Sequence, residues 1–82
     1  MDDAEFDLLD ELYFVTSFEE LQANTDMSEA KIRDTLISLA GRGWICVYEN
    51  SDEELADFDL MGNFKLYFYL ASKKGLLAHN KQ

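Results

Sequence analysis

The hydrophobic positions in the first half of the chain recur at the spacing of helices. Residues 2–15 place apolar side chains on one helical stripe, at Phe6, Leu8, Leu9, Leu12, Tyr13 and Val15, and an aspartate at position 2 or 3 can cap the start. Residues 28–40 repeat this spacing with Ile32, Leu36 and Leu39, and Ser28 is the predicted N-cap of this helix. We therefore predict two amphipathic helices over these ranges.

A shorter helix is predicted between them. Ser17-Phe18-Glu19-Glu20 has the capping-box pattern, with a hydroxyl at the N-cap and a carboxylate three residues later, and Leu21 is its apolar anchor. The run Asn24-Thr25-Asp26 predicts a turn, because Asn and Asp tolerate the left-handed conformation. Residues 17–40 thus read as two short helices joined by a tight turn.

The second half of the chain has the residues of strands. Gly43 suits the left-handed position that ends a helix, and residues 44–49 (WICVYE) and 64–70 (FKLYFYL) are β-branched and aromatic, which predicts an antiparallel pair. Alternation in the second strand puts Phe64, Leu66, Phe68 and Leu70 on one face and Lys65, Tyr67 and Tyr69 on the other. A third strand is an option at residues 14–17.

The remaining segments are a loop and a final helix. Residues 50–63 are long for a hairpin connection, and Gly62-Asn63 marks their closing turn. Ser72 predicts the cap of a short terminal helix anchored by Leu76 and Leu77. The pattern as a whole predicts a single α+β domain over residues 1–82.

Length and composition narrow the class of protein. A chain of 82 residues with 48% hydrophobic and 13% aromatic residues fits one small folded domain with little room for a large internal pocket. The apolar runs are too short to cross a bilayer, and the acidic start lacks the basic region of a secretory signal. Cys46 is the single cysteine, so we expect a cytoplasmic protein without a membrane partner.

The sequence offers no pattern typical of catalysis or of metal binding. His79 is one histidine in a tail that we expect to be solvated, and Cys46 is expected to be a small buried strand residue. The acids at 52–59 lack the glycine and closing glutamate of a calcium loop. We therefore expect no enzyme, no catalytic or metal-ligating residues, no cofactor and no small-molecule substrate.

Charge is unevenly distributed along this acidic chain. Seven basic residues face seventeen acidic ones, for a net charge of −10. Residues 1–29 and 49–59 contain acids and no base, whereas Lys31, Arg33 and Arg42 fall in the predicted helix–turn–strand region and the last residues are basic. The long-range field should repel nucleic acid, although a local basic patch could still form.

The order of elements resembles a winged helix. Residues 32–45 (IRDTLISLAGRGWI) resemble the recognition helix and start of the wing in bacterial winged-helix transcriptional regulators of the MarR and PadR kind, and residues 69–77 (YLASKKGLL) are similar to the segment that follows their wing. The resemblance implies a three-helix core, a C-terminal β-hairpin wing and a short terminal helix, with the helix at 28–40 in the DNA major groove. The family contact positions correspond to Glu29, Ala30, Lys31, Arg33, Asp34 and Ser38.

Two functions follow from this resemblance, and the residues support them unequally. The favoured one is a small regulatory or adaptor module that binds a protein partner or a second copy, through Ile37, Phe58, Tyr48, Tyr67 and Tyr69. The alternative is a DNA-binding regulator, with Lys31, Arg33, Ser38 and Arg42 as contacts. The acidic segment at the expected wing tip, where such regulators are usually basic, favours protein contact. A third reading leaves this segment as a solvated surface without a partner.

Overall fold

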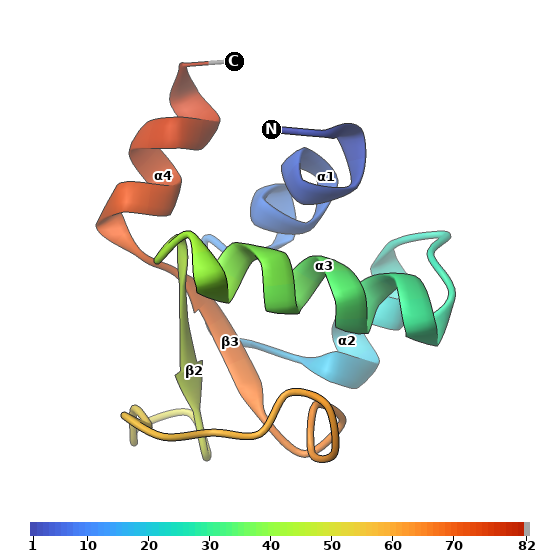
Figure 1. Ribbon diagram of the computed structural model, residues 1–82, viewed down its shortest axis with the longest axis vertical. Helices are drawn as coiled ribbons and strands as arrows, with labels where there is room; N and C mark the ends of the chain where they lie inside the picture. Colours follow the sequence, from blue (N-terminus) through green and yellow to red (C-terminus); the bar gives the residue numbers. More distant parts are fainter. Residues whose placement is uncertain (82) are drawn as a thin grey trace.

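The computed structural model describes residues 1–81, which form an α+β domain (Figure 1). In chain order the elements are α1 (Asp3–Glu11), β1 (Thr16–Ser17), α2 (Phe18–Asn24), α3 (Glu29–Gly41), β2 (Ile45–Tyr48), β3 (Phe68–Ala71) and α4 (Lys73–Asn80). The predicted α+β class is therefore confirmed. No helix in residues 1–81 is long and apolar enough to cross a membrane.

The helix starts follow the local capping residues. Ser17, Ser28 and Ser72 each accept a hydrogen bond from a backbone N–H in the first turn of the helix that follows, as predicted. Asp2 caps α1, and Glu5 completes a capping box that the sequence analysis missed. Each start depends on residues within four positions in the chain, which is why the sequence predicts it.

The end of α1 depends on contacts from distant residues. The helix stops at Glu11, whereas the hydrophobic pattern predicted a helix to residue 15. The Thr16 hydroxyl donates to the carbonyl oxygens of Glu11 and Phe14, at 3.1 and 2.7 Å, and the Ala71 N–H donates to the Leu12 carbonyl at 2.8 Å. These bonds turn the chain out of the helix and into β1.

The predicted glycine ending of α3 is confirmed, whereas the predicted conformation of the turn after α2 is not. Gly43 has φ +72°, and the N–H groups of Gly43 and Trp44 donate to the carbonyls of Ala40 and Leu39, which is a Schellman ending for α3. The break after Asn24 is also confirmed, but its predicted left-handed conformation is wrong. Thr25 is extended there, and Gly43 alone has a positive φ among residues 1–81.

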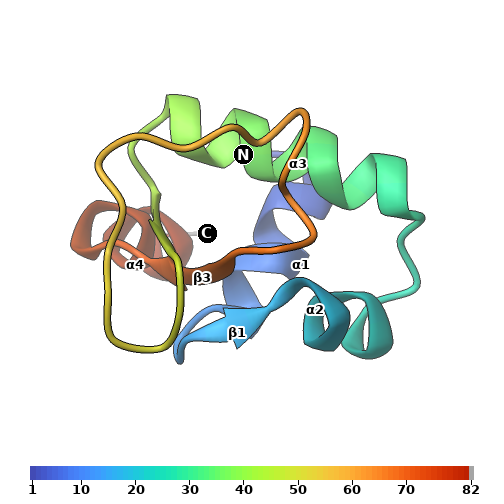
Figure 2. The same cartoon turned by 90° about the horizontal axis from the view of Figure 1, so that it is seen from below.

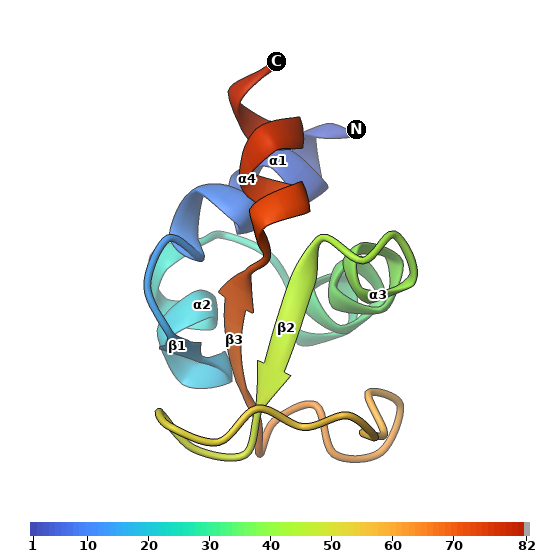
Figure 3. The same ribbon diagram turned by 90° about the vertical axis from the view of Figure 1, so that its left-hand side faces the viewer.

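The three strands form one antiparallel sheet in the order β1-β3-β2 (Figure 3). The optional third strand is confirmed, because Thr16 and Ser17 pair with Tyr69 and Phe68. Figure 3 shows α1 and α4 beyond one end of the sheet and the 49–67 segment at the other. Helix α3 runs along one side, where its residues Ile32, Leu36 and Leu39 are fully buried, as predicted.

The register of β3 overturns the predicted faces of this strand. Val47 is buried and lies opposite Tyr69, and directly opposed residues of an antiparallel pair share a face. Tyr69 is therefore 0% exposed, and its hydroxyl donates to the Phe64 carbonyl at 2.5 Å. The prediction that Tyr69 lies on an exposed face is wrong. Phe68 and Leu70 lie half-buried on the opposite face.

The strand also begins later than its composition indicates. Residues 64–66 form a turn in which the Leu66 N–H donates to the Asn63 carbonyl at 2.9 Å. Phe64 is buried beside Phe18, with ring centroids 5.2 Å apart, and Leu66 is exposed. The aromatic content of residues 64–66 thus predicted a strand, whereas the buried Phe64 ring holds these residues in a turn.

Helix α4 packs against α1 and against the turn before β2. The backbone at Gly75 approaches the Trp44 carbonyl so closely that an added Cβ would lie 2.0 Å from its oxygen. Leu76 is partly buried as predicted, but Leu77 is 53% exposed, so its role as an anchor is wrong. His79 takes that place and is buried at 8% exposure, which corrects the expected solvated tail.

Candidate functional site

The basic side chains predicted to contact DNA are largely paired with acids of the same chain. The Arg33 guanidinium lies 2.9 Å from the carboxylate of Asp34, its neighbour on α3. Arg42 lies 2.9 Å from the Glu5 carboxylate, and the Ser38 hydroxyl donates to the same oxygen at 2.8 Å. Three of the four candidate DNA contacts therefore already have partners within the domain.

Glu5 is the acid in the ion pair with Arg42. Its side chain is 3% exposed although it lies on the first helix of the chain. Burial raises the pKa of Glu5, but the hydrogen bonds from Asp2 and Ser38 and the charge of Arg42 outweigh burial, so the pKa lies below its ordinary value. An ionised carboxylate thus joins α1 to the C-terminal half of α3.

The other cations do not add to one basic surface. Lys31 is exposed in the first turn of α3, and Lys65 lies 2.8 Å from the Glu29 carboxylate. Lys73 and Lys74 begin α4, which lies beside the opposite end of α3 in Figure 1. Lys31, Arg33 and Lys65 therefore lie toward the start of α3. Arg42, Lys73 and Lys74 lie toward its end, where Ser72 is bonded to Gly43.

An apolar groove lies between α3 and the segment that links β2 to β3. It is shallow and largely open to solvent, with a volume of about 390 Å³. Its lining residues are Ile37, Ala40 and Gly41 on α3 and Phe58, Asp59, Leu60 and Met61 on the linking segment. Figure 2 shows this segment running alongside α3. The structure thus brings together Ile37 and Phe58, two of the predicted protein-contact residues.

The wall opposite α3 is held in place by its own hydrogen bonds. The Asp59 carboxylate accepts from the N–H groups of Met61 and Gly62, both at 3.1 Å, and the Asp59 N–H donates to the Tyr67 hydroxyl at 3.0 Å. Leu60 is 7% exposed and anchors this turn in the core, while Met61 is 66% exposed at the rim. Tyr67, also predicted as a contact, therefore supports the groove from behind Phe58.

The acidic part of the same segment is bonded to the sheet. The Leu55 N–H donates to the Val47 carbonyl at 2.8 Å, and the Glu49 N–H donates to the Glu53 carbonyl at 2.9 Å. Glu54 also forms an isolated antiparallel bridge with Tyr48. The segment therefore covers the outer edge of β2, which argues against the reading in which it is only a solvated loop.

The predicted tyrosine surface is divided among three places. Tyr48 lies on the outer face of the sheet with Phe68, Tyr67 lies behind the groove, and Tyr69 is in the core. The three side chains therefore do not form one contact face. The physical reason is the register of β3 combined with the turn at residues 64–66.

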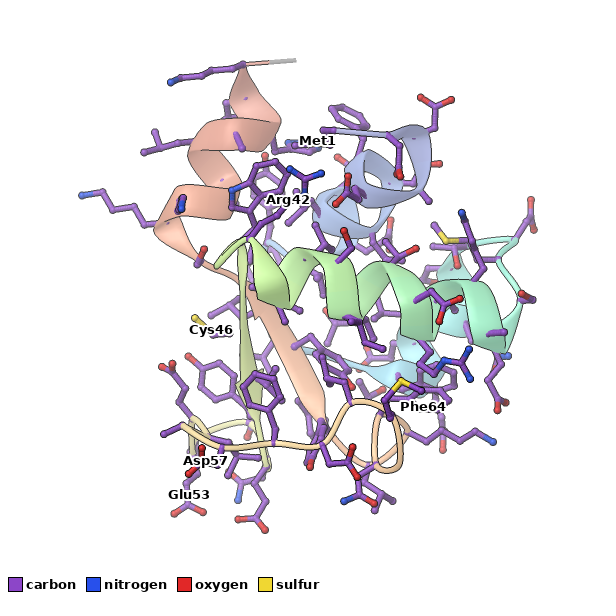
Figure 4. All side chains as sticks on the ribbon, viewed as in Figure 1. Met1, Arg42, Cys46, Glu53, Asp57 and Phe64 are labelled. Atoms are coloured by element: carbon purple, nitrogen blue, oxygen red, sulfur yellow. The ribbon has the colours of Figure 1, made fainter. Side chains whose placement is uncertain are left out.

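Cys46 shares the outer face with Tyr48. It is half-buried in the middle of β2, and Figure 4 shows its sulfur pointing away from α3. Burial and the neighbouring Glu54 raise the pKa of the Cys46 thiol. Burial, Glu54 and Cys46 likewise raise the pKa of Tyr48. These shifts favour the neutral thiol and phenol, and hence argue against a nucleophilic Cys46.

His79 forms a small aromatic cluster between α4 and α1. Its ring stacks on Phe6 with centroids 4.2 Å apart, and its Nδ1 shares a hydrogen bond with the Tyr13 hydroxyl at 2.9 Å. Its Nε2 lies 3.6 Å from the Asp10 carboxylate and makes no hydrogen bond. Among residues 1–81, no group of three or more His, Cys, Asp or Glu side chains could hold a metal ion.

A second hollow has acidic walls. It encloses about 420 Å³ and is lined by Asp7, Asp10, Glu11, Asn24, Thr25, Asp26 and Met27, between α1 and the α2–α3 turn. Neither this hollow nor the small residues Ala40 and Gly41 of the apolar groove were predicted from the sequence. Those two follow Ile37 at i+3 and i+4, a spacing that could have pointed to them.

Comparison with known proteins finds no relatives of this chain. No protein-family model, no curated protein and no solved structure matches the chain.

Proposed function

We propose that the chain is a winged-helix domain that serves as a small adaptor and binds a protein partner through the apolar groove. The element order and the β1-β3-β2 sheet support the winged-helix part of this proposal. In this reading α2 and α3 are the helix–turn–helix, and residues 49–67 are the wing. Because one fold serves many functions, the function has to be argued from the groove.

One observation carries the choice of a protein partner. Ile37 and Phe58 stand on opposite walls of one groove, although 20 residues separate them in the sequence. Apolar and aromatic side chains that surround a concave surface are typical of the central part of protein interfaces. Met61 at the rim adds a flexible apolar side chain that can adapt to a partner.

The arrangement of charge supports the same choice over DNA. Affinity for duplex DNA depends mainly on cations that contact phosphates. Arg33 and Arg42 are paired with acids of the domain, and residues 49–59 of the proposed wing contain six acids and no base. A wing of this charge would repel the phosphate backbone at the place where a wing normally contacts it.

The groove is tested by removing its exposed apolar side chains. We expect the double variant Phe58→Ser, Met61→Ser to capture at least about tenfold less of its partner from cell lysate than the original protein, because the burial of two apolar side chains is lost. Leu77→Ser is the matched control, since Leu77 is also exposed but lies on α4. Equal capture by all three proteins would contradict the proposal.

DNA binding is tested separately by titration of mixed-sequence duplexes. Salt is set at about 50 mM and then at about 200 mM, because binding through phosphate contacts weakens steeply between these concentrations. We expect no complex at either concentration with protein in the high micromolar range. A salt-sensitive complex that is lost in Lys31→Ala would instead support the regulator alternative.

A further inference from the structure

We propose that the groove receives a short amphipathic helix of another protein, with apolar residues on one face and lysines or arginines beside them. This inference rests on the proposed function and specifies the chemistry of the partner. Three features support this inference: the charge of the segment that forms one wall of the groove, the pairing of the strand edge on β2, and the open space at Gly41.

The segment that forms one wall of the groove carries acids that have no counterion among residues 1–81, and one of these acids, Asp59, lines the groove itself. Residues 49–59 contain six acids and no base. None of these acids belongs to an ion pair among residues 1–81. Figure 4 shows Glu53 and Asp57 on this segment near the bottom of the view, away from the ion-paired Arg42 above them. A basic partner would supply the missing countercharge.

The same charge argues against a second copy as the occupant. Each chain carries a net charge of −10, so two copies that met at this acidic segment would repel each other. In a second copy, Lys74 directly precedes the closely packed Gly75, and Lys73 lies one residue earlier. A partner with its own basic face therefore fits the groove better.

The nearest strand edge favours a helix over an extended peptide. An extended peptide commonly binds by adding a strand to an open sheet edge. Here the Val47 carbonyl on β2 already accepts from the Leu55 N–H, so the linking segment occupies the end of that edge from Val47 onward. The Asp59 carboxylate likewise accepts two N–H groups of its own turn. A helix satisfies its own backbone and needs only apolar contact from the groove.

The floor of the groove allows a close approach. Ala40 and Gly41 are small, and no atom lies within 4 Å of the position that a Cβ on Gly41 would occupy. A partner side chain can therefore reach the backbone of α3 at this point. The same space accepts a Cβ on Gly41, and the conformation of Gly41 in the last turn of α3 accepts a side chain, so we expect Gly41→Leu to extend its side chain into the groove.

The experiment uses two synthetic helical peptides of about four turns. Both have leucines at i, i+4 and i+7, and one has lysines and arginines beside them where the other has glutamates. Binding is followed by NMR shifts of the ¹⁵N-labelled protein. We expect the basic peptide to shift Ile37, Gly41 and Met61 and to bind at least about tenfold more tightly than the acidic one.

The Gly41→Leu variant locates the occupant. We expect it to weaken the basic peptide at least about tenfold, while Gln22→Leu, an exposed position on α2, leaves the affinity unchanged. Equal affinity for the acidic peptide would overturn the charge argument. Unchanged binding by Gly41→Leu would place the peptide outside the groove and overturn the inference.

Three further outcomes show whether this inference, the proposed function or both are contradicted. If neither peptide binds but the Phe58→Ser, Met61→Ser variant still captures less partner from lysate than the original protein, a basic helix is the wrong class of partner. The proposed function of the groove is then retained. If sedimentation shows a dimer that Gly41→Leu abolishes, the occupant is a second copy, and the inference is overturned. If neither peptide binds and no variant changes capture, both proposals are contradicted.

Discussion

Glu5 joins two helices through one buried carboxylate. The residue belongs to the capping box of α1, yet its second carboxylate oxygen accepts hydrogen bonds from Ser38 on α3 and from Arg42, which follows the end of that helix. A helix N-terminus also favours negative charge, which adds to the preference for the ionised form. The carboxylate is therefore part of the tertiary structure, and its protonation should be coupled to folding.

We predict that Glu5→Gln lowers the free energy of unfolding at neutral pH by about 1–3 kcal/mol, because the charged partners of the carboxylate are left incompletely satisfied. The folded protein has a lowered pKa at Glu5, so the stabilisation is present above the ordinary carboxyl pKa and is lost as pH falls through the lower folded value. Denaturant unfolding from about pH 7 to about pH 3 measures this difference.

The control for this prediction is Glu19→Gln, at an exposed position in the first turn of α2. Its stability difference from the original protein should be small at neutral pH. The Glu5→Gln difference should shrink as the solution is acidified. A Glu5→Gln difference that grows toward acid pH would show that the folded state does not hold the carboxylate ionised.

Tyr69 shows what a residue pattern leaves undetermined. Alternation along residues 64–70 separates two sets of side chains, but both sets contain aromatic residues that could fill a core. The choice depends on which residues of β1 and β2 lie opposite, and a register change of one residue exchanges the faces. The burial of Tyr69 therefore follows from pairing between segments far apart in the chain.

The elements differ in how far they could be predicted, and the reason is the range of the contacts that define them. The starts of α2, α3 and α4 depend on serines next to each helix, so the sequence places them correctly. The end of α1 and the start of β3 depend on Thr16, Ala71 and the turn at 64–66. No local pattern contains that information.

The position of α4 depends on the absence of a side chain at Gly75. We predict that Gly75→Ala destabilises the protein by about 1–3 kcal/mol, because the new methyl group would overlap the Trp44 carbonyl and push α4 away from the sheet. Amide hydrogen exchange in α4 should quicken at the same time. Thermal unfolding and exchange by NMR measure the two effects.

Gly41→Ala is the matched control within the same protein. Nothing lies within 4 Å of its new methyl group, and alanine favours the helix by about 0.5–1 kcal/mol over glycine, so a small gain in stability is expected. If the two variants changed stability equally, the close approach at Gly75 would not position α4.

At the scale of the whole molecule, the groove is the feature that the sequence could not supply. Ile37 and Phe58 were each predicted as protein contacts, but their meeting depends on the turn held by Asp59 and Tyr67. Arg42 likewise looks like a phosphate contact until Glu5 is placed beside it. Sequence therefore identified candidate side chains, whereas folding decided which of them share a surface.

The large negative charge should make stability depend on salt. We predict that raising sodium chloride from about 20 mM to about 500 mM increases the unfolding temperature by a few degrees, because screening weakens repulsion among the acids. The double variant Asp52→Asn, Glu53→Gln removes two exposed charges and should show a smaller increase. A decrease with salt would mean that the ion pairs outweigh the repulsion.

The cover over β2 has a consequence for engineering and divergence of this domain. The chain between Glu49 and Leu55 pairs with the last residues of a strand margin whose backbone groups would otherwise be open to neighbouring molecules. Deletions in this stretch would expose that strand edge, and we expect them to produce protein that aggregates into fibres even where the core is intact. Residues 56–58, which lie between the sheet bonds and the Asp59 turn, are the part that can vary in length at least cost to solubility.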